Sequence, residues 1–239
     1  MTRHFLKLFL LLLFISSPGP LFAQQPSIID EMLRLKPSLV EVTGIRSGIV
    51  GKSNGRVRVA EIENRGAGVI IHPSGIIVTN AHVVDHAGHI KVLFHDGTQR
   101  GAQVLKFASA LDLSLLKVEA PSPLPAVAIA DSAAIKLNDE IFTVGNSPLL
   151  KEAITGGRIT GLASSRNGAY SNSYESDFFQ TTLDLYSGDS GGPLFNKNAQ
   201  LIGLVSAKLI SQGHASFAVS SNKIARYLTV CLKEAQQKQ

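Results

Sequence analysis

Short apolar or alternating runs, separated by Gly, Asn, Asp and Pro, constrain the fold of this chain more than any other feature. They predict strands near 40–43, 68–71, 76–79, 91–94, 102–107, 113–118, 141–144, 153–160, 178–182, 193–195, 201–207 and 217–219. No long helical pattern separates them, and His72–Gly75 and His95–Gly97 are typical hairpin turns. Short strands at this spacing predict an all-β antiparallel sandwich or barrel.

A Pro-rich stretch, Ala120–Pro125, divides the predicted strands into two sets of about six. We interpret it as a linker between two barrels, the first at about 38–120 and the second at about 126–220. Two further segments, Arg46–Arg65 and Ser164–Asp177, are polar and are interpreted as long surface loops.

Helical patterns are confined to the two ends of this β-rich region. Ser27–Lys36 has helical spacing and stops before a proline. A second helix is expected at about 222–233, capped by Ser221 or Asn222 and packed on the second barrel. The apolar face of this second helix comprises Ile224, Tyr227, Leu228, Cys231 and Leu232.

The first 23 residues have the pattern of a secretory signal peptide. Arg3 and Lys7 precede the apolar run Leu8–Ile15, which is too short to cross a bilayer, and a cleavage-like end precedes Gln24. An uncleaved anchor is the alternative. We therefore expect a mature domain at 24–239 that is exported, periplasmic or secreted, and not inserted in a membrane once the leader is removed.

Composition excludes several classes of protein. Apolar residues make up 44% of the chain, enough for a packed core, and charged residues only 17%, too few for a coiled coil. The single cysteine, Cys231, excludes a disulfide framework and a cysteine-rich zinc module, and we expect it to be a buried thiol. The formal charge of +5 includes Arg3 and Lys7 of the leader and does not by itself indicate a nucleic-acid partner.

A serine between glycines stands out in Ser187–Leu194, which reads Ser-Gly-Asp-Ser-Gly-Gly-Pro-Leu. A serine hydroxyl is a weak nucleophile unless it is exposed and activated by a base. Glycines let a substrate carbonyl approach and turn backbone N–H groups toward one point. Ser190 is therefore the candidate nucleophile, with the N–H groups of Gly188 and Ser190 as a candidate oxyanion hole. The alternative is a tight turn whose serine binds only its own loop.

His82 and Asp112 are the candidate general base and its orienting acid. His82 follows an apolar strand, and an imidazole exchanges protons near neutral pH. Asp112 begins an apolar strand, where a carboxylate is costly to bury without a partner. The alternative for Asp112 is a strand cap satisfied by backbone N–H groups. Asp85 and Asp96 are rival acids, but the first is only three residues from His82 and the second lies in a turn.

The chain resembles the chymotrypsin-like serine proteases, and among them the bacterial HtrA/Deg-type trypsin-like peptidases. The resemblance covers about residues 38–230 and rests on Gly66–Ile71, the strings around His82, Asp112 and Ser190 in that order, Val144–Asn146 and Ser216–Val219. It implies a double six-stranded antiparallel β-barrel with a C-terminal helix and a site between the barrels. It also implies no cofactor or metal and, as partners, protein or peptide substrates. A role in protein quality control and a trimeric state are further implications.

Some positions depart from the family pattern. HtrA proteases usually have Asn before the nucleophile, where this chain has Asp189. PDZ domains usually follow the protease domain, and none is expected here because only Lys233–Gln239 follow the predicted helix. Six residues before Ser190 stands Asp184, the offset that in trypsin carries the acid of the primary pocket. By analogy it favours Arg or Lys before the scissile bond.

The same analogy assigns the remaining substrate-binding residues. The pocket walls are expected from Ser206, Ala207 and Lys208 on one strand and Ser216 on another, with strand 206–208 pairing with the substrate backbone. The positive charge of Lys208 would neutralise the Asp184 carboxylate. Leu185 is more apolar than the residue that the trypsin pattern has at this position.

These observations predict an exported serine endopeptidase that acts through a Ser-His-Asp triad and an acyl-enzyme. Two other classes were weighed. His82, His86 and His89, with His95 near, have spacing that suggests zinc, but Gly88 interrupts any helix that would align them. A catalytically idle peptide-binding adaptor with the same fold is the other alternative, and it would be expected to lack a triad residue.

Overall fold

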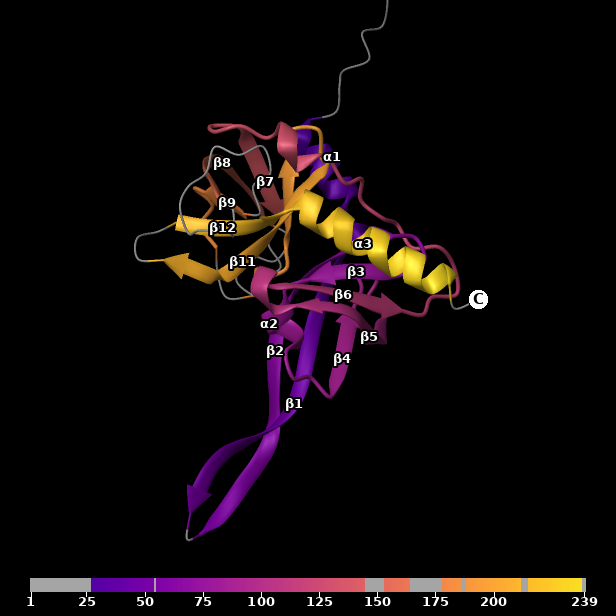
Figure 1. The fold of residues 1–239 in the computed structure, drawn as a ribbon, viewed down its shortest axis with the longest axis vertical. Coiled ribbons are helices and arrows are strands. Elements are labelled where there is room, and N and C mark those ends of the chain that lie inside the picture. The colour runs from indigo at the N-terminus through magenta and orange to yellow at the C-terminus, as the bar shows by residue number, and fades with distance from the viewer. Residues whose placement is uncertain are drawn as a thin grey trace, which may run out of the picture.

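The computed structural model describes residues 27–53, 55–144, 153–163, 178–185, 188–211 and 215–237. Two closed six-stranded antiparallel barrels, in the orders β1-β2-β3-β6-β5-β4 and β10-β11-β12-β9-β8-β7, form the molecule (Figure 1). The predicted fold class, a double six-stranded barrel with a C-terminal helix, is confirmed. The expected signal peptide lies outside the described residues.

The first barrel consists of β1 (Leu39–Ser53), β2 (Arg56–His72), β3 (Ile76–Thr79), β4 (His89–Leu93), β5 (Gln99–Ala108) and β6 (Leu113–Val118). The second consists of β7 (Glu140–Val144), β8 (Ile154–Ala163), β9 (Phe178–Thr181), β10 (Pro193–Asn196), β11 (Leu201–Ser211) and β12 (Ala215–Ser220). The helices are α1 (Ile28–Arg34), α2 (Ala81–Val84) and α3 (Ser221–Gln236), with single 3-10 turns η1 (Lys36–Ser38), η2 (Ser109–Leu111) and η3 (Ser132–Ala134).

The expectation that Arg46–Arg65 forms a loop is wrong. β1 and β2 stay paired from the barrel out to Ser53↔Arg56, whereas the pairing of β1 with β4 ends at Ile45↔His89. The outer parts of β1 and β2 therefore form a two-stranded ribbon that extends away from both barrels (Figure 1). Gly55, with φ of 75°, supplies the left-handed backbone that such a hairpin turn requires.

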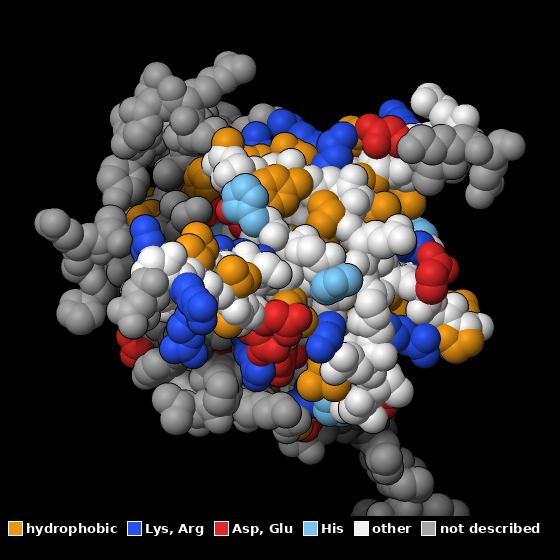
Figure 2. Space-filling model, turned by 90° about the horizontal axis from the view of Figure 1, so that it is seen from below, with side chains coloured by type: hydrophobic (Ala, Val, Ile, Leu, Met, Phe, Trp, Pro, Cys, Tyr) orange, Lys and Arg blue, Asp and Glu red, His pale blue; other side chains and the backbone are white. Residues whose placement is uncertain are grey.

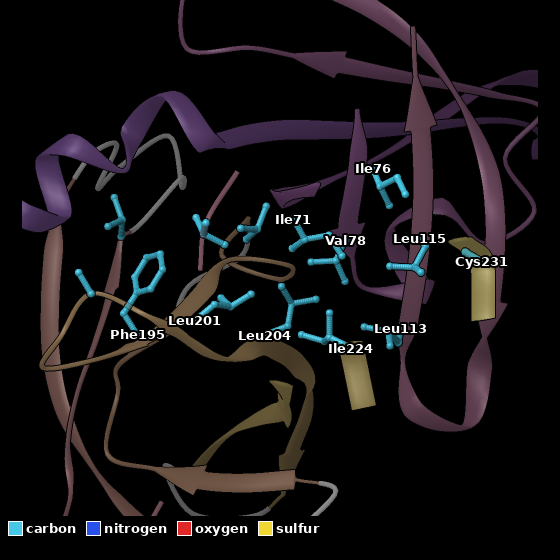
Figure 3. Close-up of a cluster of buried hydrophobic side chains, with 14 of the residues drawn as sticks. Ile71, Ile76, Val78, Leu113, Leu115, Phe195, Leu201, Leu204, Ile224 and Cys231 are labelled. Carbon is cyan, nitrogen blue, oxygen red and sulfur yellow. The ribbon is translucent and has the colours of Figure 1, made fainter. Parts of the chain in front are cut away.

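Three apolar clusters account for the buried core. One fills the first barrel and includes Val42, Ile70 and Leu116, and another fills the second barrel and includes Phe179 and Ile202. The third joins the barrels, as Figure 3 shows, and takes side chains from α1, both barrels, the inter-barrel segment and α3. Its members include Met32, Val78, Leu115, Val127, Leu201, Leu204, Ile224 and Cys231.

The inter-barrel segment is attached to both barrels by backbone hydrogen bonds. Leu124 and Val127 donate to carbonyls of Pro73 and Ile70 in the first barrel, and Ala130 donates to Leu201 of the second. The Pro-rich stretch is thus the start of a connecting segment that is hydrogen-bonded to both barrels.

The C-terminal helix forms and packs on the second barrel as expected, and it packs on the first barrel as well. α3 contacts β11 and β12 and also β5 and β6 of the first barrel, across which it runs in Figure 1. Ile224 and Cys231 of α3 are buried in the inter-barrel cluster, and Lys106 of β5 forms an ion pair with Glu234 at 3.2 Å. Among the described residues, the structure has no helix long and apolar enough to cross a bilayer.

Candidate active site

His82 lies in the short helix α2, directly after β3. The strand ends at Thr79, and Asn80 has the extended backbone of an N-cap, with φ of −72° and ψ of 147°. His82 is half-buried, with 27% of its side chain exposed, so part of the side chain is accessible. The change from strand to helix thus places an imidazole at the end of the first barrel.

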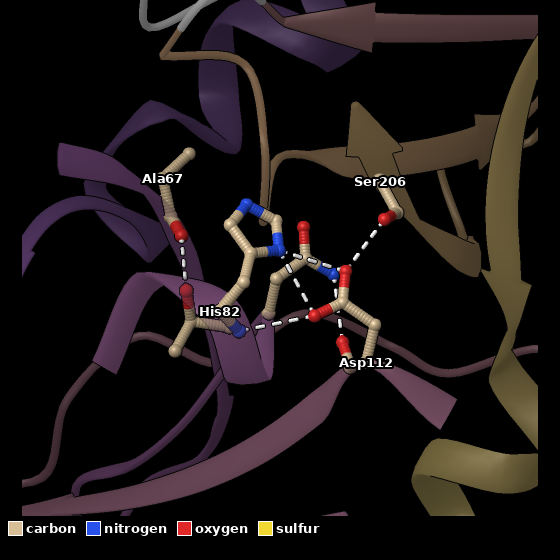
Figure 4. Close-up of polar contacts among 6 residues, drawn as sticks. Ala67, His82, Asp112 and Ser206 are labelled. Carbon is tan, nitrogen blue, oxygen red and sulfur yellow. Dashed lines mark hydrogen bonds and ion pairs between the residues drawn. The ribbon is translucent and has the colours of Figure 1, made fainter. Parts of the chain in front are cut away.

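Asp112 faces His82 from the loop that precedes β6. Its backbone is left-handed, with φ of 51° and ψ of 44°, and its side chain is 8% exposed. The His82 ring nitrogen Nδ1 lies 2.9 and 2.8 Å from the two carboxylate oxygens, and the His82 backbone N–H donates to Oδ1 at 3.0 Å (Figure 4). The structure therefore brings these two predicted residues together although thirty positions separate them.

Ser206 of β11 completes the surroundings of this carboxylate. Its hydroxyl donates to Oδ2 of Asp112 at 2.6 Å and is fully buried. The sequence placed Ser206 in a pocket wall and did not indicate this contact, which links the second barrel to the acid of the first. A buried serine at strand 201–207 carries no local signal of a partner 94 residues away.

The charge state of Asp112 follows from these contacts. Burial raises the pKa of a carboxyl group and is the largest single influence here. Hydrogen bonds from the His82 ring, from Ser206 and from the His82 backbone, with the charge of His82, together outweigh it and hold the pKa of Asp112 below its ordinary value. Asp112 is therefore a carboxylate at neutral pH.

Asn80 is a further buried group at this site that the sequence analysis did not single out. Its side-chain amide donates to the backbone carbonyl of Asp112 at 2.9 Å, and the residue is fully buried. The amide oxygen Oδ1 has no hydrogen-bond partner in the described part of the chain. An orphaned polar atom costs stability, so the residue is poorly explained by packing alone.

The Ser190 loop is docked on the first barrel. The backbone carbonyl of Ser190 accepts from Ala67 N of β2 at 2.7 Å, and the Ala67 carbonyl accepts from the Thr79 hydroxyl at 2.7 Å. Gly191, with φ of 85°, lies so close that a Cβ there would be 2.1 Å from the Ala67 carbonyl oxygen. Only glycine fits this approach, which explains the Gly after the serine.

The structure describes the remaining predicted residues in part. Gly188 is left-handed, with φ of 104°, and Ser190 is 4% exposed. Asp184 is exposed, while the Ser216 hydroxyl lies 2.5 Å from that of Thr181 within the second barrel. Ala207 and Lys208 lie in β11. Their side chains, Ser187 and the Ser164–Asp177 segment are outside the described part.

The rival acids and the histidine series lie elsewhere. Asp85 is directed at the exposed His86, 3.8 Å away, and Asp96 accepts from Thr98 in the β4–β5 turn. His89 is exposed on β4. Within the described residues, no three His, Cys, Asp or Glu side chains are grouped as a metal site requires.

A family model described as the trypsin-like peptidase domain matches residues 66–204, which include His82, Asp112 and Ser190. The chain belongs to this family. The predicted resemblance to HtrA/Deg-type proteases is also confirmed. The chain is 36% identical over 177 residues to the periplasmic serine endoprotease DegP of Salmonella typhimurium, covering 72% of this chain and 37% of DegP.

Other relatives agree with this assignment. Serine protease HTRA1B of Danio rerio is 28% identical over 212 residues, 89% of this chain and 43% of that protein. A solved structure of the HtrA-type protease AlgW with a decapeptide superposes with a TM-score of 0.75, at 22% identity, covering 88% of this chain and 68% of that one. The chain thus has the fold of this trypsin-like peptidase family and spans less than half the length of the two named relatives.

Proposed function

We propose that this trypsin-like peptidase domain is a serine endopeptidase that cleaves proteins through Ser190, His82 and Asp112. The observation that carries the proposal is the contact of both Asp112 oxygens with His82 Nδ1. It holds the proton on Nδ1, so that Nε2 is the nitrogen available to accept a proton. The inclusion of Ser190 is supported by the hydrogen bond from Ala67 N of the first barrel to the Ser190 carbonyl.

Each group has a defined chemical role in this proposal. His82 Nε2 takes the Ser190 hydroxyl proton as the oxygen attacks the substrate carbonyl, and the ionised Asp112 stabilises the resulting imidazolium. The N–H groups of Gly188 and Ser190 hold the oxyanion. His82 then gives its proton to the leaving amine, which leaves an acyl-enzyme, and a water attacks that ester by the same route.

Substrate would bind along the second barrel. The backbone of Ser206, Ala207 and Lys208 is proposed to pair with the substrate chain. Asp184, being exposed, is available to a basic side chain before the scissile bond, and Ser216 is proposed as a pocket wall. Asp184→Ala should erase any preference for Arg or Lys in a peptide-library cleavage profile.

A fluorophosphonate probe tests the nucleophile directly. Wild-type protein should be labelled at Ser190, and Ser190→Ala should abolish both labelling and casein cleavage. Ser74→Ala is a matched control, because the Ser74 hydroxyl contacts a histidine ring, His72 Nδ1 at 2.8 Å, on the surface. That control should stay fully labelled.

The idle peptide-binding adaptor is the competing function, and the same assay separates it. Specific peptide binding without labelling or turnover would establish the adaptor and overturn the peptidase. We further propose export to the periplasm and a role in protein quality control, supported by the sequence of the first 23 residues and by the periplasmic DegP relatives.

A further inference from the structure

The two-stranded ribbon formed by the outer parts of β1 and β2 contributes none of its described side chains to the three apolar clusters. Its outer part, residues 48–60 from the pair Gly48↔Ala60 to the turn, lies beyond the last pairing of β1 with β4. It points downward in Figure 1, so the view from below in Figure 2 looks at the molecule from the ribbon's outer end. On that face, Lys and Arg side chains lie among hydrophobic ones, with Asp and Glu side chains between them.

Four β-branched side chains of the outer ribbon are held in solvent. Ile49 is 69% exposed, Val50 51%, Val57 49% and Val59 64%. Ile49 and Val59 are direct cross-strand partners, and Val57 shares their face because side chains alternate along a strand. Ile49, Val57 and Val59 together make one apolar face, which is different from isolated exposed residues scattered over a surface.

The charges of the outer ribbon all have one sign. Residues 48–60 contain Lys52, Arg56 and Arg58 and no acidic residue. Arg56 and Arg58 alternate with Val57 and Val59 and so point from the opposite face. The nearest acids, Glu61 and Glu63, lie closer to the barrel, and Glu63 is paired with Arg65 at 2.7 Å.

This combination fits one kind of partner. We propose that the outer ribbon docks on an anionic phospholipid bilayer. Its apolar face would enter the boundary between headgroups and acyl chains, and its basic side chains would lie at the level of the lipid phosphates. Lys52, which pairs with Val57 on the apolar face, would reach the headgroups around its edge.

Other partners fit the same residues less well. A second copy of the ribbon would bring together two sets of basic side chains with no acid to offset them. Nucleic acid is disfavoured because residues 48–60 contain no aromatic side chain for stacking, and the exposed apolar face would make no favourable contact with phosphates.

The chain offers a sensitive probe because it contains no tryptophan. In the full chain purified from an exporting host, Ile49→Trp should show a blue-shifted emission with vesicles of phosphatidylcholine and phosphatidylglycerol, and no shift with phosphatidylcholine alone. Leu137→Trp is the control, at a side chain 57% exposed on the second-barrel side, and its emission should not change. Equal shifts at both positions would overturn the proposal.

Vesicle flotation then tests the basic side chains and the apolar side chains of the ribbon separately. The pair Arg56→Glu and Arg58→Glu should weaken partition onto anionic vesicles by at least about tenfold, since each basic group near a surface matters. Val57→Ser with Val59→Ser should also weaken it. Lys136→Glu with Lys197→Glu makes the same change in net charge at exposed positions elsewhere and should have little effect.

Every variant shares the same N-terminus, so any contribution of the leader cancels. Unchanged flotation of both ribbon variants would overturn the proposal. So would a ribbon-dependent dimer in analytical ultracentrifugation, lost in Val57→Ser with Val59→Ser, that forms without vesicle binding.

Discussion

At the scale of single residues, Asp112 is costly to hold in its folded conformation for two reasons. Its carboxylate is removed from water, and its backbone occupies the left-handed region that Asp and Asn tolerate better than other non-glycine residues. Hydrogen bonds from His82 and Ser206, and one to its carbonyl from Asn80, hold it there. Loss of any of these donors should therefore affect the position of His82.

The lowered pKa of Asp112 makes stability depend on acid pH. Since the pKa is lower in the folded protein than in the unfolded chain, the ionised carboxylate stabilises the fold above the unfolded value of about 4. This contribution is lost as the pH falls through the folded pKa. The urea midpoint of wild type should therefore fall more steeply below about pH 4 than that of Asp112→Asn. Parallel curves would contradict the role of this carboxylate.

Asn80 is expected to act by positioning. Asn80→Leu keeps the volume but removes the amide that holds the Asp112 carbonyl. Turnover of a peptide substrate should fall by about 10²-fold with little change in KM, because catalysis is sensitive to small displacements of the base. The low-field NMR resonance of the His82 Nδ1 proton should shift. A purely structural residue would change the melting temperature and leave that resonance in place.

Local strings predicted some of these residues and not others. His82, Asp112 and Ser190 stand in short motifs whose neighbours already indicate a strand end, a costly acid and a glycine-rich loop. Asn80 is not singled out by the sequence, and Ser206 is expected only as a pocket wall. Both residues contact Asp112, which is 32 positions from Asn80 and 94 from Ser206 in the sequence. No local pattern contains that information.

At the scale of elements, the ribbon shows where pattern analysis fails. Short apolar or alternating runs predict strands, and the predicted ranges 76–79 and 113–118 agree with β3 and β6 to the residue. The outer ribbon has no buried face against the barrel, so its polar and glycine-containing sequence suggested a loop. Its pairing instead follows from a left-handed Gly55 and from β-branched residues that favour strands.

The Ser190 loop and β2 fit together only without a side chain at Gly191. Gly191→Ala would bring a Cβ to 2.1 Å from the Ala67 carbonyl in a backbone that disfavours alanine. Displacement of the loop should lower the rate of fluorophosphonate labelling by about 10²-fold. Gly101→Ala in β5, where a Cβ would meet nothing within 4 Å, is the control and should label at the wild-type rate. Equal rates would show that the loop tolerates the displacement.

At the scale of the whole molecule, the inter-barrel cluster fixes the relative positions of the residues of the site. Asp112 and His82 come from the first barrel, whereas Ser206 and Ser190 come from the second, so the distances between them depend on how the barrels pack. The shared cluster, the attached inter-barrel segment and α3 all fix that packing. The sequence predicted both barrels but not this arrangement, because an apolar strand does not reveal which surface it faces.

α3 therefore supports stability across both barrels. Ile224 is fully buried in the inter-barrel cluster, so Ile224→Ala should lower the free energy of unfolding by about 2–4 kcal/mol. Lys106→Ala removes only the half-exposed ion pair with Glu234 and should cost about 1 kcal/mol or less. Because the cluster belongs to both barrels, Ile224→Ala should shift one common transition seen by circular dichroism and by loss of labelling. A variant in which labelling is lost well before the secondary structure would instead show that the barrels unfold separately.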